Sequence, residues 1–216
     1  TELTIGENAV IGHSAFFGAS KLESVTLGKG AVIGDCAFYN NDSLKTMDLS
    51  GVTSIGESAF SCDMLGIFVN SAMTSQFYDE KGNYIYRFYA ADLESVDLAS
   101  ATSLGANAFA QCRKLKSVKL GEGLTHIPDQ AFFYCEVLED FDFADVVSVG
   151  SNAFNNTALK NPDLSRLETV GKYAFVYNEE MTEVTLNPNG VKLEEGAFSY
   201  CTALATPVHL DKATYV

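Results

Sequence analysis

Apolar residues recur along this chain in a fixed order with a period close to 22 residues. Each period holds an Ala-Phe pair, an aliphatic residue five positions before the Phe, and a Leu-x-x-Val-x-Leu pattern five or six positions after it. The phenylalanines of the pair are Phe16, Phe38, Phe60, Phe109, Phe132, Phe154, Phe175 and Phe198. Successive members lie 21–23 residues apart, except for one interval of 49. We expect one diverged copy in that interval, because 93–98 (LESVDL) repeats 22–27 (LESVTL).

The Leu-x-x-Val-x-Leu pattern predicts a short strand. In 115–120 (LKSVKL), alternation places Val118 and Leu120 on one side of the strand and Ser117 and Lys119 on the other. A unit of this length cannot bury its apolar side alone, so neighbouring units have to stack, and stacking pairs their strands into a parallel ladder. The pattern therefore predicts a right-handed solenoid of about nine coils. Each coil is expected to hold one short strand, an extended return segment and a tight turn.

A glycine follows the aliphatic residue in six of the eight clear copies. Glycine at a fixed place in a repeat indicates either a bend that needs positive φ or a close approach by a neighbouring backbone. Pro128 and Glu194 replace it in the other two copies, and Pro162 and Pro207 fall within predicted strands. These residues, together with the stretch 71–88, are the places where the chain departs from the repeat.

The complete repeat resembles that of a known family. The string Ile-Gly-x-x-Ala-Phe-x-x-Cys-x-x-Leu-x-x-Val-x-Leu, matched best by 104–120, resembles the BspA-like class of leucine-rich repeats, and the resemblance covers essentially the whole chain. It implies an α/β-type leucine-rich-repeat solenoid, mostly strand and turn. We therefore expect a single solenoid segment over 1–216, cut within a coil at both ends, with a diverged coil and an insertion around 71–92.

The resemblance also carries expectations about location and activity. It implies a secreted or surface-exposed protein of bacteria or parasitic protists, with adhesion or binding of a host protein as the usual role. The chain opens directly in repeat sequence, so a signal and an anchor are expected outside it. The leading interpretation is a non-catalytic protein-binding or adhesion segment, whose oligomeric state the sequence leaves open.

Charge and hydropathy narrow the classes of partner. The formal net charge is −14, which disfavours nucleic acid and anionic membranes because both require a basic face. No apolar run approaches the ~20 residues of a membrane span, so direct insertion into a membrane is not expected. The expected partner is an extracellular or host protein with a basic patch.

The cysteines and histidines do not form a chemical motif. Four of the five cysteines share one repeat position, where other copies have Asn or Ala; they are Cys62, Cys112, Cys135 and Cys201. Either Cys or Asn can serve local backbone groups in a buried turn, so we expect free structural thiols, although Cys112 and Cys135 lie in adjacent coils. His13, His126 and His209 are far apart, so we expect no metal and no cofactor. No nucleophile motif or paired catalytic carboxylate stands outside the repeat, which argues against an enzyme.

Outward strand positions form columns of one residue per coil, about 4.8 Å apart. We expect these columns to line the concave face of the solenoid, where a protein partner would dock. The candidate binding residues on this face are Asp48, Asp97, Lys119, Asp140, Asp142, Asp163 and Glu183. The alternative is a solvated face on which Lys119 balances Asp97 and Asp142.

Aromatic residues gather in two further places. Tyr134, Tyr177 and Tyr200 share the second position after the Phe, where they bind a ligand or simply seal the turn. The diverged stretch 73–93 is expected to form a projecting hairpin around Gly82-Asn83, with Phe77, Tyr78, Tyr84 and Tyr86 as candidate binding residues. The alternative is a loop whose aromatic rings pack on their own coil.

Two other function classes remain open at this point. Surface tyrosines favour a carbohydrate-binding module, although the chain has no Trp, which offers the largest stacking face. The segment could equally be the scaffold domain of an enzyme, which a catalytic domain in the flanking sequence would indicate.

Overall fold

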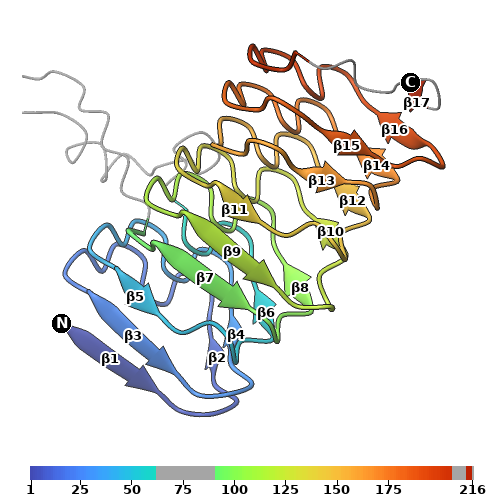
Figure 1. Ribbon diagram of the computed structural model, residues 1–216. Helices are drawn as coiled ribbons and strands as arrows, with labels where there is room; N and C mark the ends of the chain where they lie inside the picture. The colour runs from blue at the N-terminus through green and yellow to red at the C-terminus, as the bar shows by residue number, and fades with distance from the viewer. Residues whose placement is uncertain (62–90, 206–212, 216) are drawn as a thin grey trace, which may run out of the picture.

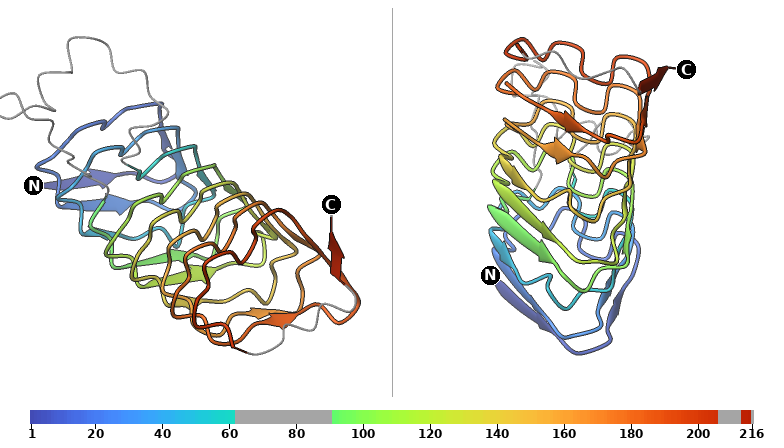
Figure 2. Two further views of the ribbon diagram at one scale, coloured as in Figure 1. Left: turned by 90° about the horizontal axis from the view of Figure 1, so that it is seen from above. Right: turned by 45° about the vertical axis from the view of Figure 1, so that its right-hand side comes forward.

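The computed structural model describes residues 1–61, 91–205 and 213–215, and within these ranges every regular element is a strand. The chain winds as a right-handed solenoid of about seven turns, with its two ends at opposite ends of the stack (Figure 1). Its coils follow one another in a single row (Figure 2). Every strand pair is parallel. The predicted solenoid is therefore confirmed.

Two series of strands run along the solenoid. We call the first series the strand face. Its strands are β1 (Glu2–Ile5), β3 (Ser24–Leu27), β5 (Thr46–Met47), β7 (Ser95–Leu98), β9 (Ser117–Leu120), β11 (Asp140–Phe141), β13 (Asp163–Leu164) and β15 (Thr185–Leu186). We call the second series the return ladder. Its strands are β2 (Val10–Ile11), β4 (Val32–Ile33), β6 (Ser54–Ile55), β8 (Ser103–Leu104), β10 (His126–Ile127), β12 (Ser148–Val149), β14 (Thr169–Val170), β16 (Val191–Leu193) and β17 (Ala213–Tyr215).

The return ladder is the main addition to the predicted coil. The sequence indicated one strand per coil and an extended return segment. In the structure the return segments of adjacent coils lie in register, for example Ile11 beside Ile33 and Ile33 beside Ile55, so their backbone groups pair. Most of these strands are only two residues long, and an alternating sequence pattern needs more residues than that to be recognised.

A continuous column of stacked phenylalanine rings forms the centre of the core. The eight rings of the Ala-Phe pairs stack in order from Phe16 to Phe198, with centroids 5.2–5.7 Å apart. The six inner rings, from Phe38 to Phe175, are fully buried. Each ring occupies the same place in its coil, so one repeat position supplies a core that runs the length of the stack.

The expected diverged copy between Phe60 and Phe109 does not lie between their coils. The two rings stack directly at 5.2 Å, and β6 pairs with β8. The Ala91 amide donates to the Phe60 carbonyl, at an N–O distance of 3.3 Å. The prediction of a coil between those of Phe60 and Phe109 is therefore wrong.

The recurring glycines permit close approach of adjacent coils. A Cβ atom on Gly34 would lie 2.7 Å from the Ile11 carbonyl oxygen, and one on Gly105 would lie 2.3 Å from the Glu57 nitrogen. Neither glycine has positive φ. That conformation occurs instead two residues further on, for example at Ser14 (φ 55°) and Asn107 (φ 57°). Of the two roles considered for these glycines, close approach is the one that the structure supports.

Hydrogen bonding along the strand face is interrupted where Pro162 precedes β13. One sheet ends at β11, and β13 begins another with β15. Proline has no amide hydrogen to donate to a ladder, so a break is expected at this residue. The coils nevertheless remain stacked, because the rings of Phe132, Phe154 and Phe175 continue without a gap.

Candidate binding site on the strand face

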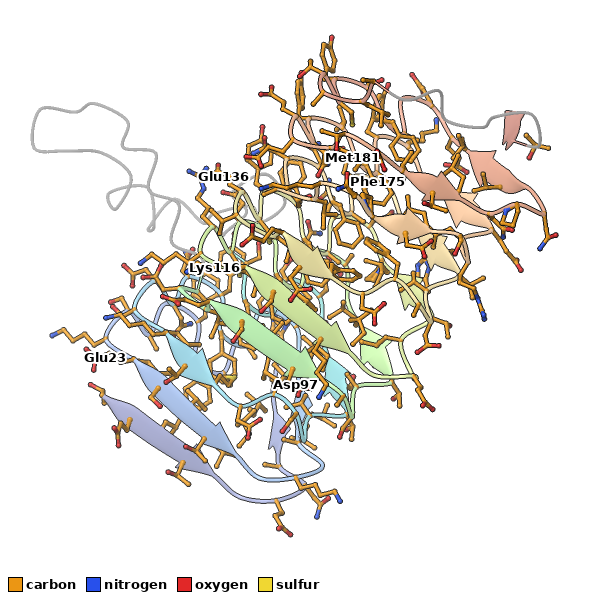
Figure 3. The ribbon with its side chains drawn as sticks, viewed as in Figure 1. Glu23, Asp97, Lys116, Glu136, Phe175 and Met181 are labelled. Atoms are coloured by element: carbon orange, nitrogen blue, oxygen red, sulfur yellow. The ribbon has the colours of Figure 1, made fainter. Side chains whose placement is uncertain are left out.

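The middle of the strand face is hollowed. A depression of about 400 Å³ is lined by Ser95, Val96, Asp97, Ser117, Val118, Lys119, Asp140 and Asp142, which belong to β7, β9 and β11 and to the residue after β11. Four of the seven predicted strand-face residues, namely Asp97, Lys119, Asp140 and Asp142, therefore lie around one depression. Asp97 extends from the end of β7 (Figure 3).

Strand alternation explains the shape of this depression. Val96 and Val118 point inward and are almost fully buried, at 4% and 3% exposed, so they form its floor. The outward Ser95 and Ser117 lie opposite each other and are small. The longer Asp97 and Lys119 also lie opposite each other and rise beside them. Small residues next to long ones therefore produce a polar hollow above an apolar floor.

The carboxylates at the strand ends also hold the turns that follow them. Oδ1 of Asp97 accepts a hydrogen bond from the amide of Ala99 at 2.9 Å, and Asp142 accepts one from Ala144 at 2.9 Å. Asp48 and Asp163 make the same contact with the serine two residues on; the lengths are 2.9 and 3.0 Å. Sequence reasoning missed this structural role, although the repeated Asp-Leu/Phe-Ser/Ala is typical of such a turn.

Asp48 and Asp97 lie closer together on the strand face than the sequence indicated. Lys119 donates to Oδ2 of Asp97 at 2.8 Å. This bond holds the pKa of Asp97 below its ordinary value, and the nearby carboxylate of Asp48 opposes the lowering. Asp48 and Asp97 were expected to be separated by one coil, but they lie close enough to interact. Hydrogen bonds from Ser50 also lower the pKa of Asp48, so both carboxylates are charged at neutral pH.

The remaining predicted residues lie outside the depression. Asp163 is in β13 opposite Thr185, beyond the break at Pro162. Hydrogen bonds from Ser165 lower the pKa of the Asp163 carboxyl. Glu183 is exposed just before β15. Phe77, Tyr78, Tyr84 and Tyr86 lie outside the described residues.

The shared cysteine position serves the backbone, as the alternation with Asn predicted. Sγ of Cys135 donates to the Phe109 carbonyl at 3.2 Å, and Nδ2 of Asn178 donates to the Phe154 carbonyl at 2.7 Å. Either side chain thus bridges a coil to the one before it. The four described cysteines are free thiols. Burial raises the pKa of the Cys135 and Cys201 thiols, which suits a structural role.

The predicted column of tyrosines lies in the turns that follow the phenylalanines of the Ala-Phe pairs. Tyr134, Tyr177 and Tyr200 all have positive φ, between 56° and 60°. The rings of Tyr177 and Tyr200 stack at 4.7 Å and remain 41% and 64% exposed. Both rings are therefore partly accessible to solvent.

The described residues contain no cluster of three or more His, Cys, Asp or Glu side chains that could hold a metal ion. Nor do residues 1–61, 91–205 and 213–215 include a helix of the length and apolarity needed to cross a bilayer.

Comparison with known proteins identifies the repeat. The solved structures that resemble this chain include two bacterial leucine-rich repeat proteins. One is a leucine-rich repeat protein from Bacteroides ovatus, with 17% identity and a TM-score of 0.41, covering 96% of this chain and 78% of that one. The other is a leucine-rich cell surface protein from Faecalibacterium prausnitzii, with 18% identity and a TM-score of 0.47. That match covers 82% of this chain and about half, 51%, of the other. No curated protein is similar enough to count as a relative.

The family model of the BspA-type leucine-rich repeat region matches six copies of its repeat, over residues 1–79 and 83–205. The stacked coils, the Phe column and the repeat signature agree with that match. The chain therefore belongs to the BspA-type leucine-rich repeat family.

Proposed function

We propose that this chain is a non-catalytic protein-binding segment of a secreted or cell-surface protein, and that a basic partner docks on its strand face. The observation that carries the proposal is the depression over β7, β9 and β11. Three carboxylates and one ammonium group surround it, so its formal charge is negative. A partner presenting Lys or Arg would be attracted to this face and held by its carboxylates.

Rigidity of the depression supports this role. Its strands are hydrogen-bonded in register, and its floor is part of the buried core. The Asp97 and Asp142 carboxylates are oriented by backbone amides of their own turns. Groups that are already ordered lose little entropy when a partner binds, which favours this surface over a loop.

The placement of the whole segment is part of the same proposal. The repeat family is consistent with a secreted or surface location, with the signal and anchor elsewhere in a longer protein. Residues 1–216 are then one solenoid segment of that protein.

The experiment replaces two carboxylates without removing their turn contacts. Asp97→Asn combined with Asp142→Asn keeps an oxygen acceptor for each turn amide but removes two negative charges. The association rate of a labelled nona-arginine peptide with the immobilised chain should fall about three- to tenfold at low salt. Raising the salt concentration should shrink the difference.

The matched control is the pair Asp35→Asn and Asp129→Asn. Each of these carboxylates follows a return-ladder strand and accepts a backbone amide of the next coil, at 2.9 and 2.7 Å. The control pair removes the same charge on the other side of the coil, so it should leave most of the rate intact. Equal rates for the two double variants would mean that the strand face is not the docking surface.

A further inference from the structure

One row of polar side chains in the depression is not used by the chain itself. Ser95 and Asp140 lie on either side of Ser117, so the three residues form a row across β7, β9 and β11. None of their side chains makes a hydrogen bond or an ion pair with any residue that the structure describes. The row therefore presents two hydroxyl groups and one carboxylate to a ligand that enters the depression.

The neighbouring row of the depression is already engaged, and it determines which charges are left over. Lys119 donates to Asp97 at 2.8 Å, so its ammonium charge is locally compensated. Asp142 accepts the Ala144 amide with Oδ1 and forms no ion pair with the described part of the chain. The charges left uncompensated around the depression are therefore those of Asp140 and Asp142, and they attract a cation.

The shape of the depression restricts the kind of cation that fits. The row of Ser95, Ser117 and Asp140 covers two strand spacings, or roughly 10 Å. Both serines are short, so the hollow of about 400 Å³ has room for the end of a long side chain. Val96 and Val118 form its apolar floor. A cation that fills the hollow has to lie over apolar atoms while it reaches acceptors on two strands.

We propose that the depression binds the guanidinium group of one arginine of the docked protein. Its five N–H donors lie in one plane, so two can bind the Asp140 carboxylate while a third binds the Ser117 hydroxyl, one strand spacing away. An ammonium group is compact and more strongly hydrated, so it gains less from the second acceptor and from the apolar floor. This inference rests on the proposed function, because the arginine belongs to the same basic partner. It adds a preference for arginine over lysine that charge alone does not provide.

The test compares nona-arginine with nona-lysine, which carry the same charge. Each peptide is titrated at low salt against the unchanged chain, Ser117→Ala and Asp140→Asn. The unchanged chain should bind nona-arginine about fivefold more tightly than nona-lysine. Ser117→Ala removes an acceptor but no charge, so it should weaken nona-arginine binding about fivefold and leave nona-lysine binding almost unchanged. Asp140→Asn should weaken the binding of both peptides and reduce the preference for arginine.

Ser24→Ala is the matched control, because Ser24 occupies the same repeat position in β3, outside the depression. It should retain the preference for nona-arginine, and thermal unfolding confirms that each variant is folded. Equal affinities of the unchanged chain for the two peptides, or an arginine preference that survives in Ser117→Ala, would overturn the arginine site. The docking surface would still stand in that case if both peptides associated more slowly with the double variant Asp97→Asn, Asp142→Asn. If neither peptide responded to that double variant, the docking surface and the arginine site would both be wrong.

Discussion

At the scale of single residues, the close spacing of the coils decides which side chains are tolerated. The sequence showed that glycine recurs after the aliphatic residue. It did not show whether the reason was a bend with positive φ or the close approach of a neighbouring backbone. Only the stacked backbones reveal it, because the atom that excludes a Cβ belongs to the preceding coil. The positive-φ position two residues later escaped sequence reasoning, since Ser, Cys, Asn, Gln and Tyr all occupy it.

Gly56→Ala should therefore destabilise the fold. The added Cβ would lie 2.5 Å from the backbone nitrogen of Asp35, so the two coils have to move apart. Overpacking of this kind costs about 1–3 kcal/mol, which urea unfolding would detect. Gly12→Ala is the control at the same repeat position, because no atom lies within 4 Å of its added Cβ. Equal losses in the two variants would contradict the close-approach explanation.

At the scale of the element, an aspartate in or next to the strand, such as Asp163 in β13, accepts a backbone amide of the turn that follows. The strands themselves were predictable, because alternation over Leu-x-x-Val-x-Leu is long enough to recognise. Two features were not predictable. The return-ladder strands are too short to show an alternating sequence pattern. The resemblance of 93–98 to 22–27 indicated an extra coil between those of Phe60 and Phe109. In the structure, 93–98 instead supplies the strand that directly follows the coil of Phe60.

Asp163 isolates the contribution of the turn contact, because its carboxylate bonds are to Ser165. Asp163→Ala removes the acceptor of the Ser165 amide and should cost about 1 kcal/mol, whereas Asp163→Asn should retain most of the stability. The pKa of Asp163 is lowered in the folded chain, so its stabilising effect is present above the ordinary value of 3.8. The charge-dependent part of that effect disappears as the pH falls through the lowered folded pKa.

Chemical denaturation at neutral and strongly acidic pH checks both statements. The unchanged chain and Asp163→Ala should differ more at neutral pH than in strong acid. An alanine variant as stable as the unchanged chain at neutral pH would show that the carboxylate contributes nothing to the turn.

At the scale of the whole molecule, one Phe column joins the coils on both sides of residues 62–90. The sequence predicted the solenoid, the buried rings and four of the residues around the depression, since each follows from a periodic position. It could not predict the depression itself. That shape depends on which coils are neighbours and on the small Ser95 and Ser117.

The central claim is that the coils of Phe60 and Phe109 are in direct contact, and a double-mutant cycle tests it most directly. Phe60→Leu and Phe109→Leu each remove one ring of a stacked pair whose centroids are 5.2 Å apart. The account predicts a coupling free energy of about 0.5–1.5 kcal/mol between them in urea unfolding. Phe38 and Phe154, which stack on no common ring, are the control pair and should be additive. Additive effects for Phe60 and Phe109, to within about 0.3 kcal/mol, would contradict the continuous column.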